Sequence, residues 1–157
     1  MVAGGCWIGW GLVPSTSHQP SATRHLIHIV RLGSPRVRDE GLRLGTVRRP
    51  PRGVPKAEFA KRNYYDVWLP ELAPSAATVS AVMAGEWSEK KWKKFVSTYV
   101  REMSTPAATH LLRTLAALSH QTNFSVGCYC EDETRCHRSI LRDLLIAEGA
   151  LLVKRAD

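Results

Sequence analysis

The chemically richest stretch of the chain is residues 126–145, where three of the four cysteines stand beside a histidine and several arginines. Cys128, Cys130, Cys136 and His137 offer the sulfur and imidazole ligands that zinc or iron prefers, so one interpretation is a metal site. Their spacing, C-x-C-x5-C-H, is not one of the common zinc-finger spacings. A second interpretation is a reactive thiol beside an anion pocket, and a third is a structural role in which buried thiols fill space. The sequence leaves these three alternatives open.

The second interpretation depends on the start of a predicted helix at Cys136. Backbone N–H groups and the helix dipole favour an anion there, and the same field lowers the pKa of a thiol. Cys136 is therefore the candidate nucleophile and His137 a candidate acid or base, and Arg138 or Arg135 is expected to bind the anion. Neither Cys128 nor Cys130 has an arginine six residues later, as the phosphate cradle of a cysteine phosphatase requires.

Positive charge is concentrated in residues 24–62, which hold eleven Lys or Arg against three acidic residues. Within this segment, residues 48–56 read RRPPRGVPK, and the prolines and glycine predict a stiff, exposed loop. A basic face favours an anionic small molecule bearing phosphate or carboxylate, or else nucleic acid, although it can also be a solvated surface. The residues expected to bind the anion, between this loop and the Cys-His-Arg residues, are Arg49, Arg52, Lys56 and Arg138.

The elements that must position these residues combine strands with helices. Short apolar runs predict the strands, and Ser75, Ser88 and Thr105 are candidate N-caps of three helices. A fourth helix is expected from about Cys136 to Gly149, between an apolar run and a second short one, which is a unit typical of parallel pairing. The predicted strands are residues 25–32, 42–47, 64–69, 124–128 and 150–153. The sequence therefore predicts an α/β fold with a mostly parallel sheet, a C-terminal βαβ unit and flanking helices.

Length and composition suit one small domain. The chain has 157 residues, of which 44% are hydrophobic, and we expect a single domain over residues 24–157 after a flexible N-terminal extension, residues 1–23. The clustered cysteines do not resemble a secreted disulfide framework, so we expect a reducing, cytoplasmic environment. No apolar run is long enough to span a bilayer, and we expect no membrane association.

Four separated blocks of sequence resemble a known family. The blocks are GLRLGTVRRPPRGVPK, YYDVWLPELAPS, W-x2-F-x3-Y-x2-E and VGCYC followed by CHRSIL. In this order and spacing they are similar to domain-of-unknown-function family 488, also called YeaO-like, over about residues 41–148. The resemblance implies a compact bacterial cytosolic α/β domain with no established activity.

The resemblance extends to single residues. One departure is Pro50, which stands where the common form of the family has a tryptophan before Pro-Arg-Gly. Some family members lack the cysteines, which implies that a metal is not a universal requirement for this fold. The positions that match the family's motifs are Arg49, Arg52, Gly53, Lys56, Trp68, residues 72–75, Cys136, His137 and Arg138.

Overall fold

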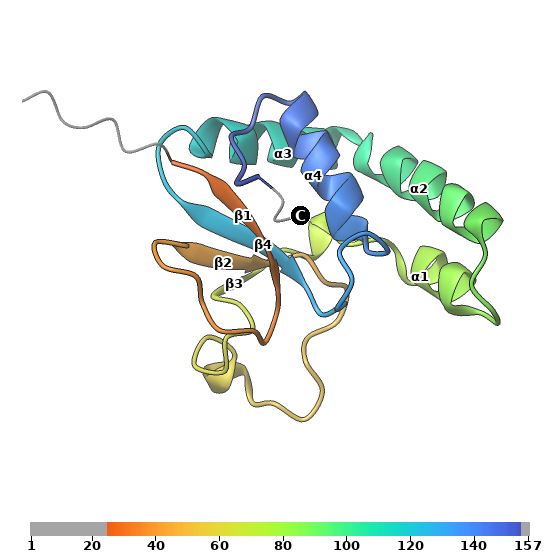
Figure 1. Ribbon diagram of the computed structural model, residues 1–157, viewed down its shortest axis with the longest axis horizontal. Helices are drawn as coiled ribbons and strands as arrows, with labels where there is room; N and C mark the ends of the chain where they lie inside the picture. The colour runs from red at the N-terminus through yellow and green to blue at the C-terminus, as the bar shows by residue number, and fades with distance from the viewer. Residues whose placement is uncertain (1–24, 155–157) are drawn as a thin grey trace, which may run out of the picture.

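Short apolar segments form one all-parallel sheet in the computed structural model, which describes residues 25–154 (Figure 1). Every position of the central strand β4 is buried, as is typical of a parallel sheet covered on both faces. The strands that the sequence predicted before residue 130 are confirmed, and the predicted extension, residues 1–23, lies outside the described residues. In the order β1-β4-β2-β3, the strands are β1 (Ile27–Arg31), β4 (Phe124–Cys128), β2 (Leu42–Gly45) and β3 (Val67–Trp68).

The helices begin at the predicted caps. The side-chain oxygens of Ser75, Ser88 and Thr105 each accept a hydrogen bond from the backbone N–H three residues later, which satisfies a donor that the first helical turn leaves unpaired. Gly149 follows the last helix in the left-handed conformation, with φ of 88°. The helices are α1 (Ala76–Met83), α2 (Glu89–Met103), α3 (Pro106–Leu118) and α4 (His137–Ala147), with short 3-10 turns η1 (Lys56–Glu58) and η2 (Pro70–Leu72).

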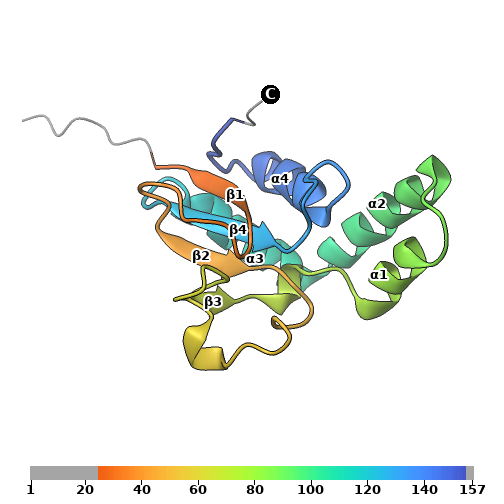
Figure 2. The ribbon, with the colours of Figure 1, turned by 60° about the horizontal axis from the view of Figure 1, so that its bottom comes forward.

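One face of the sheet carries the main core. Leu44, Phe124 and Val126 point from this face into a cluster with buried side chains of α2, α3 and α4. The opposite face is covered by the loops that follow β1 and β2 rather than by helices (Figure 2). Tyr65 lies against this second face at Gly45, where a side chain of any other residue would meet its ring.

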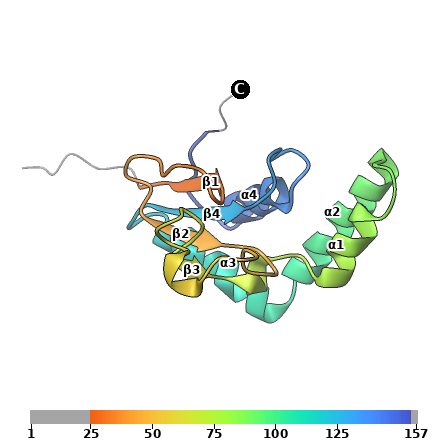
Figure 3. The ribbon, with the colours of Figure 1, turned by 90° about the horizontal axis from the view of Figure 1, so that it is seen from below.

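The hairpin of α1 and α2 stands to one side of the sheet, toward the carboxyl ends of the strands (Figures 1 and 3). Helix α1 packs mainly on α2, and α2 in turn contacts α3 and α4. Phe95 and Tyr99 of α2 are buried and the ring of Trp92 stacks on Phe95, so the aromatic stripe of this helix belongs to the core, as the sequence predicted.

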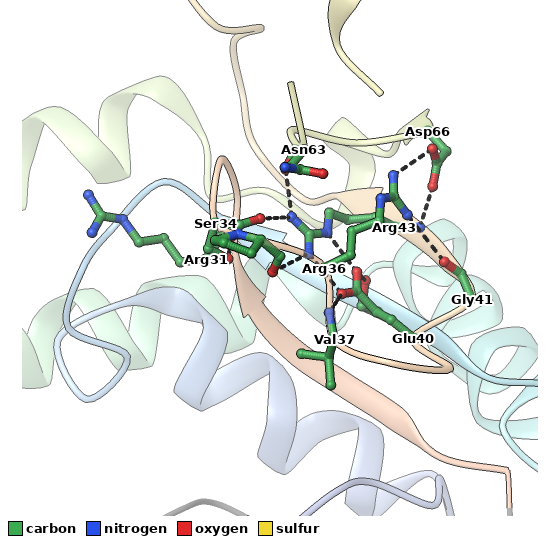
Figure 4. Close-up of polar contacts among 11 residues, drawn as sticks. Arg31, Ser34, Arg36, Val37, Glu40, Gly41, Arg43, Asn63 and Asp66 are labelled. Carbon is green, nitrogen blue, oxygen red and sulfur yellow. Dashed lines mark hydrogen bonds and ion pairs between the residues drawn. The ribbon is translucent and has the colours of Figure 1, made fainter. Parts of the chain in front are cut away.

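A buried polar network ties the loops to the second face of the sheet (Figure 4). Arg43 is fully buried and forms a two-pronged ion pair with Glu40 over 2.6 and 2.7 Å. The same guanidinium donates to the backbone carbonyls of Ser34 and Asn63, and Ser125 of β4 donates to Glu40. Ion pairs also involve four other arginines of the basic segment, Arg31, Arg36, Arg38 and Arg62. The acids that pair with Arg38, Arg43 and Arg62 belong to the same segment, so the segment keeps most of its net positive charge.

The C-terminal βαβ unit ends in a weaker strand than predicted. Residues 150–153 contribute a single parallel bridge, between Leu152 and Ile27 of β1. The N–H of Ile27 donates to the carbonyl of Leu151 over 2.8 Å, and the N–H of Val153 donates to the carbonyl of Ile27 over 3.0 Å. Within residues 25–154, no helix combines the length and the apolar character needed to cross a membrane.

Candidate metal centre

Three cysteines converge at the carboxyl edge of the sheet. Cys128 is the last residue of β4, Cys130 lies in the following loop and Cys136 immediately precedes α4. Their sulfur atoms all lie within 4.8 Å of one another, and those of Cys128 and Cys130 are 3.7 Å apart. Cys128 and Cys136 are buried, whereas Cys130 is exposed. The fold therefore brings together three of the four ligands in the predicted metal set.

Arg138 lies beside this cluster, turned inward. It is only 2% exposed, and its Nη2 donates to the backbone carbonyl of Cys130 over 2.6 Å. Its Nε donates to the sulfur of Cys136 over 3.4 Å. The contacts of this guanidinium are with carbonyl and sulfur groups, so Arg138 organises the cysteine loop and places a positive charge next to the thiols.

His137 is buried in the first turn of α4. Its Nε2 lies 2.8 Å from the backbone carbonyl of Thr46, which can only accept, so this nitrogen carries the proton. In the neutral ring Nδ1 is then an acceptor, and it lies 3.8 Å from the sulfur of Cys136. His137 thus links the loop after β2 to the cysteine cluster, and it stands outside the group of three close sulfur atoms.

The pKa values of the three thiols are shifted in different directions. Hydrogen bonding with Cys130 and burial raise the pKa of Cys128, which therefore keeps its proton. Hydrogen bonding with Cys128 lowers the pKa of Cys130, and the charge of Arg138 acts in the same direction. Hydrogen bonding with Cys128 also lowers the pKa of Cys136. The pKa is thus lowered for two thiols of the cluster and raised for the third.

All three cysteines line a cavity of about 410 Å³ between the sheet edge and the α1–α2 hairpin. Its other walls are the loop after β2, the first turn of α4 and the inner side of the hairpin. The hydroxyl of Tyr129 donates to the carbonyl of Arg49 over 3.3 Å and so connects the two loops at the sheet edge. The basic loop and the cysteine loop are therefore neighbours.

The cations predicted to bind an anion are placed differently from one another. Arg49 lines the cavity, whereas Arg52, Lys56 and Arg138 are not among its lining residues. Arg52 and Lys56 are exposed on the loop surface, and Arg138 is buried behind the cysteines. The lining also includes Arg135, which the sequence offered as an alternative to Arg138, and Arg48, which the sequence did not single out for this role.

The motif of a cysteine, five residues and an arginine, which is typical of a cysteine-phosphatase phosphate cradle, does occur at Cys136 and Arg142, although the sequence analysis considered only Cys128 and Cys130. The structure gives this pair no such geometry, because the residues between them belong to helix α4. Arg142 donates to Glu133 and to the carbonyl of Val153, away from the cysteine sulfurs.

The acidic run of the cysteine loop faces other parts of the molecule. Glu131 pairs with Arg31 over 2.9 Å, and Asp132 lies 3.8 Å from Arg135. These two acids therefore contact basic side chains, Glu131 in the basic segment and Asp132 within its own loop, and neither lines the cavity.

The α1–α2 hairpin is the part of the site that sequence reasoning missed. Val79 and Met83 of α1 and Trp92 of α2 line the cavity, although their spacing indicated only helices. Trp87, in the turn of the hairpin, lies under the guanidinium of Arg135 with 4.6 Å to the ring centroid. No sequence signal indicated this role, because the high exposure of Met83 and Trp87 is seen only in the structure.

Comparison with known families gives one match. A family model, DUF488-N3a, described as "Active DUF488-N3 subclade", matches residues 27–149. This range runs from the start of β1 to just beyond α4 and includes all the residues of the cysteine cluster. Comparisons with curated proteins and with solved structures found no match.

Proposed function

The chain belongs to the DUF488-N3a family, as its sequence blocks indicated, and we propose that it binds a zinc or iron ion through Cys128, Cys130 and Cys136. The observation that carries this proposal is the mutual distance of the three sulfurs. In a tetrahedral zinc site with Zn–S bonds of about 2.3 Å, neighbouring sulfurs lie about 3.8 Å apart. The 3.7 Å between Cys128 and Cys130 is close to that edge length.

The proposed site is open rather than closed. Three protein ligands with a fourth position for water or substrate are typical of catalytic zinc, whereas structural zinc has four protein ligands. The cluster borders the cavity, so the fourth position would face it. Bound zinc would supply Lewis acidity or a water of lowered pKa. The word "active" in the description of the family also favours a reactive site.

The charge of the surroundings supports the same proposal. Three thiolates and one divalent ion carry a net charge of −1, which a single adjacent cation can balance. Arg138 provides that cation, and its N–H group donates to the sulfur of Cys136 as outer-shell donors do in metal–thiolate sites. His137 holds the start of α4 against Thr46 and so fixes the position of the preceding cysteine.

Metal analysis tests this proposal. Protein purified without chelator is expected to contain about one zinc or iron ion per chain, and Cys128→Ser or Cys136→Ser is expected to lower that content at least tenfold, in line with the strict ligand requirement of thiolate sites. Cys6→Ser is the matched control, because this cysteine lies outside the cluster in sequence. Metal-free wild-type protein that also fails to take up added zinc or ferrous iron would refute the proposal.

A second candidate is an activated thiol that works without metal. The contacts of Cys136 with Arg138 and His137 favour it, because a cation and an imidazole near a thiol promote ionisation. In metal-free protein, Cys136 should then react with iodoacetamide well below the pH at which an ordinary thiol reacts. An ordinary pH profile of alkylation at Cys136, located by mass spectrometry, would exclude this candidate.

A further inference from the structure

The cavity beside the cysteine cluster has a largely apolar wall. Val79, Val82 and Met83 of α1 face it, together with Trp92 and Phe95 of α2. Met83 is 75% exposed, so this wall presents apolar surface to solvent. Burial of such surface by a ligand contributes about 25 cal/mol per Å². An apolar ligand body of suitable size would therefore be stabilised along the hairpin.

The charged side chains that line the cavity are all basic. Among the described residues that line the cavity, none is acidic, and three are arginines. Arg48 is held by the backbone carbonyls of Ala73 and Pro74, over 2.6 and 3.1 Å. For Arg49, by contrast, only the backbone carbonyl is engaged, and nothing in residues 25–154 forms a hydrogen bond or ion pair with its guanidinium. Arg49 is thus available to a ligand.

The third arginine connects the two sides of the cavity. Arg135 comes from the cysteine loop, and its guanidinium lies 4.6 Å above the ring of Trp87 in the hairpin turn. A guanidinium in this position is attracted by the ring face, typically by about 0.5–1 kcal/mol at an exposed site. The contact keeps a positive charge at the edge of the apolar wall.

From this arrangement we infer that the cavity binds a small amphiphilic anion, with an aromatic or branched aliphatic body on the α1–α2 wall and one carboxylate, sulfonate or phosphate group on Arg49. A fully polar anion would leave the apolar wall in contact with water, and a neutral apolar molecule would not form an ion pair with the exposed Arg49. This inference specifies the class of ligand that binds in the cavity beside the proposed metal centre. It rests on the proposed function for the metal at the three cysteine sulfurs.

Fluorescence titration with a defined probe tests the ligand class. The probe is 8-anilinonaphthalene-1-sulfonate, its neutral counterpart is N-phenyl-1-naphthylamine, and sodium sulfate represents the anion alone. We expect the sulfonate probe to bind at least tenfold more tightly than either of the other two. Arg49→Ala should weaken it about tenfold, the effect of losing one charge-assisted hydrogen bond, while Arg49→Lys should retain part of the affinity.

Two controls locate the probe. Lys61→Ala removes an exposed cation of the same basic segment and should leave the affinity unchanged. Bound probe should also slow the alkylation of Cys130 in metal-free protein, because this cysteine lines the cavity. Equal affinity of the two naphthalene probes, equal effects of the Arg49 and Lys61 substitutions, or unprotected Cys130 would each overturn the inference.

The same titration separates this inference from the proposed function. Measurements are made on zinc-loaded and on metal-free protein. Protein that binds the sulfonate probe through Arg49 but takes up no metal would refute the metal centre and support the ligand class. Protein that takes up one metal ion but shows no preference for the sulfonate probe would support the metal centre and refute the ligand class.

Discussion

Replacing Glu40 by Gln removes the carboxylate of the most deeply buried ion pair in the described part of the molecule. Burial by itself raises the pKa of Glu40, but hydrogen bonds from Arg43 and Ser125 outweigh it and lower the pKa from 4.5 to about 2. The N–H of Val37 donates to the same carboxylate over 2.9 Å. The charged form of Glu40 is therefore strongly preferred in the folded state.

The pKa difference gives the size of the effect. A carboxyl group with a pKa of about 2 in the folded state and 4.5 in the unfolded state contributes about 3 kcal/mol to the free energy of unfolding at neutral pH. Loss of one partner of a buried pair costs about 3–5 kcal/mol in other proteins, which is the same range. We therefore expect Glu40→Gln to lower the free energy of unfolding by about 3 kcal/mol at pH 7.

The pH dependence follows from the direction of the shift. Because the pKa of Glu40 is lowered on folding, its contribution is present above pH 4.5 and is lost as the pH falls toward 2. Urea denaturation of wild-type protein and Glu40→Gln should thus give curves that converge below pH 4.5. Asp39→Asn is the control, because Asp39 and its partner Arg38 are exposed and should contribute less than about 1 kcal/mol. A Glu40→Gln effect no larger than that of the control, or one independent of pH, would refute this reasoning.

Three further predictions concern the site and its supports. Arg138→Met should lower zinc affinity about 10- to 100-fold in a chelator competition, with Arg138→Lys in between, because the N–H···S bond and the compensating charge are lost; unchanged affinity would contradict the role given to Arg138. Gly45→Ala should destabilise the fold by about 1–3 kcal/mol in urea, because the new Cβ would lie 2.4 Å from the ring of Tyr65; a neutral effect would mean that the ring moves freely. Tyr99→Phe should cost about 1–3 kcal/mol, because the buried carbonyl of Leu72 loses its 2.7 Å hydrogen bond, and thermal unfolding would show it.

Local signals in the sequence predicted most of the elements. The strand at residues 124–128 and the helix that follows Cys136 have the predicted bounds within two residues, because a continuous apolar run and a terminal glycine mark them. The three predicted helix caps are also confirmed, because a cap depends on only four neighbouring residues. The weak strand near Leu152 is the exception, because local composition does not show how many backbone pairs it forms with β1.

The composition of the site could be predicted only in part. Parallel strands place their carboxyl ends at one edge, so the meeting of the cysteine loop and the basic loop followed from the fold class. No local signal indicated that Arg138 turns inward to the Cys130 carbonyl, or that the α1–α2 hairpin lies over the same edge. Both depend on long-range packing, which periodicity within one helix does not encode. The burial of Arg43 with Glu40 escaped prediction for the same reason, because a count of charges does not show which ones are paired.

The most direct test of the metal centre is X-ray absorption spectroscopy of the zinc-loaded protein. An open site formed by Cys128, Cys130 and Cys136 predicts three sulfur neighbours at about 2.3 Å and one oxygen or nitrogen neighbour at about 2.0–2.2 Å. In Cys136→Ser protein, the zinc that still binds when excess zinc is added should have fewer sulfur neighbours. A zinc spectrum with four sulfur neighbours, or with none, would contradict the account of this site.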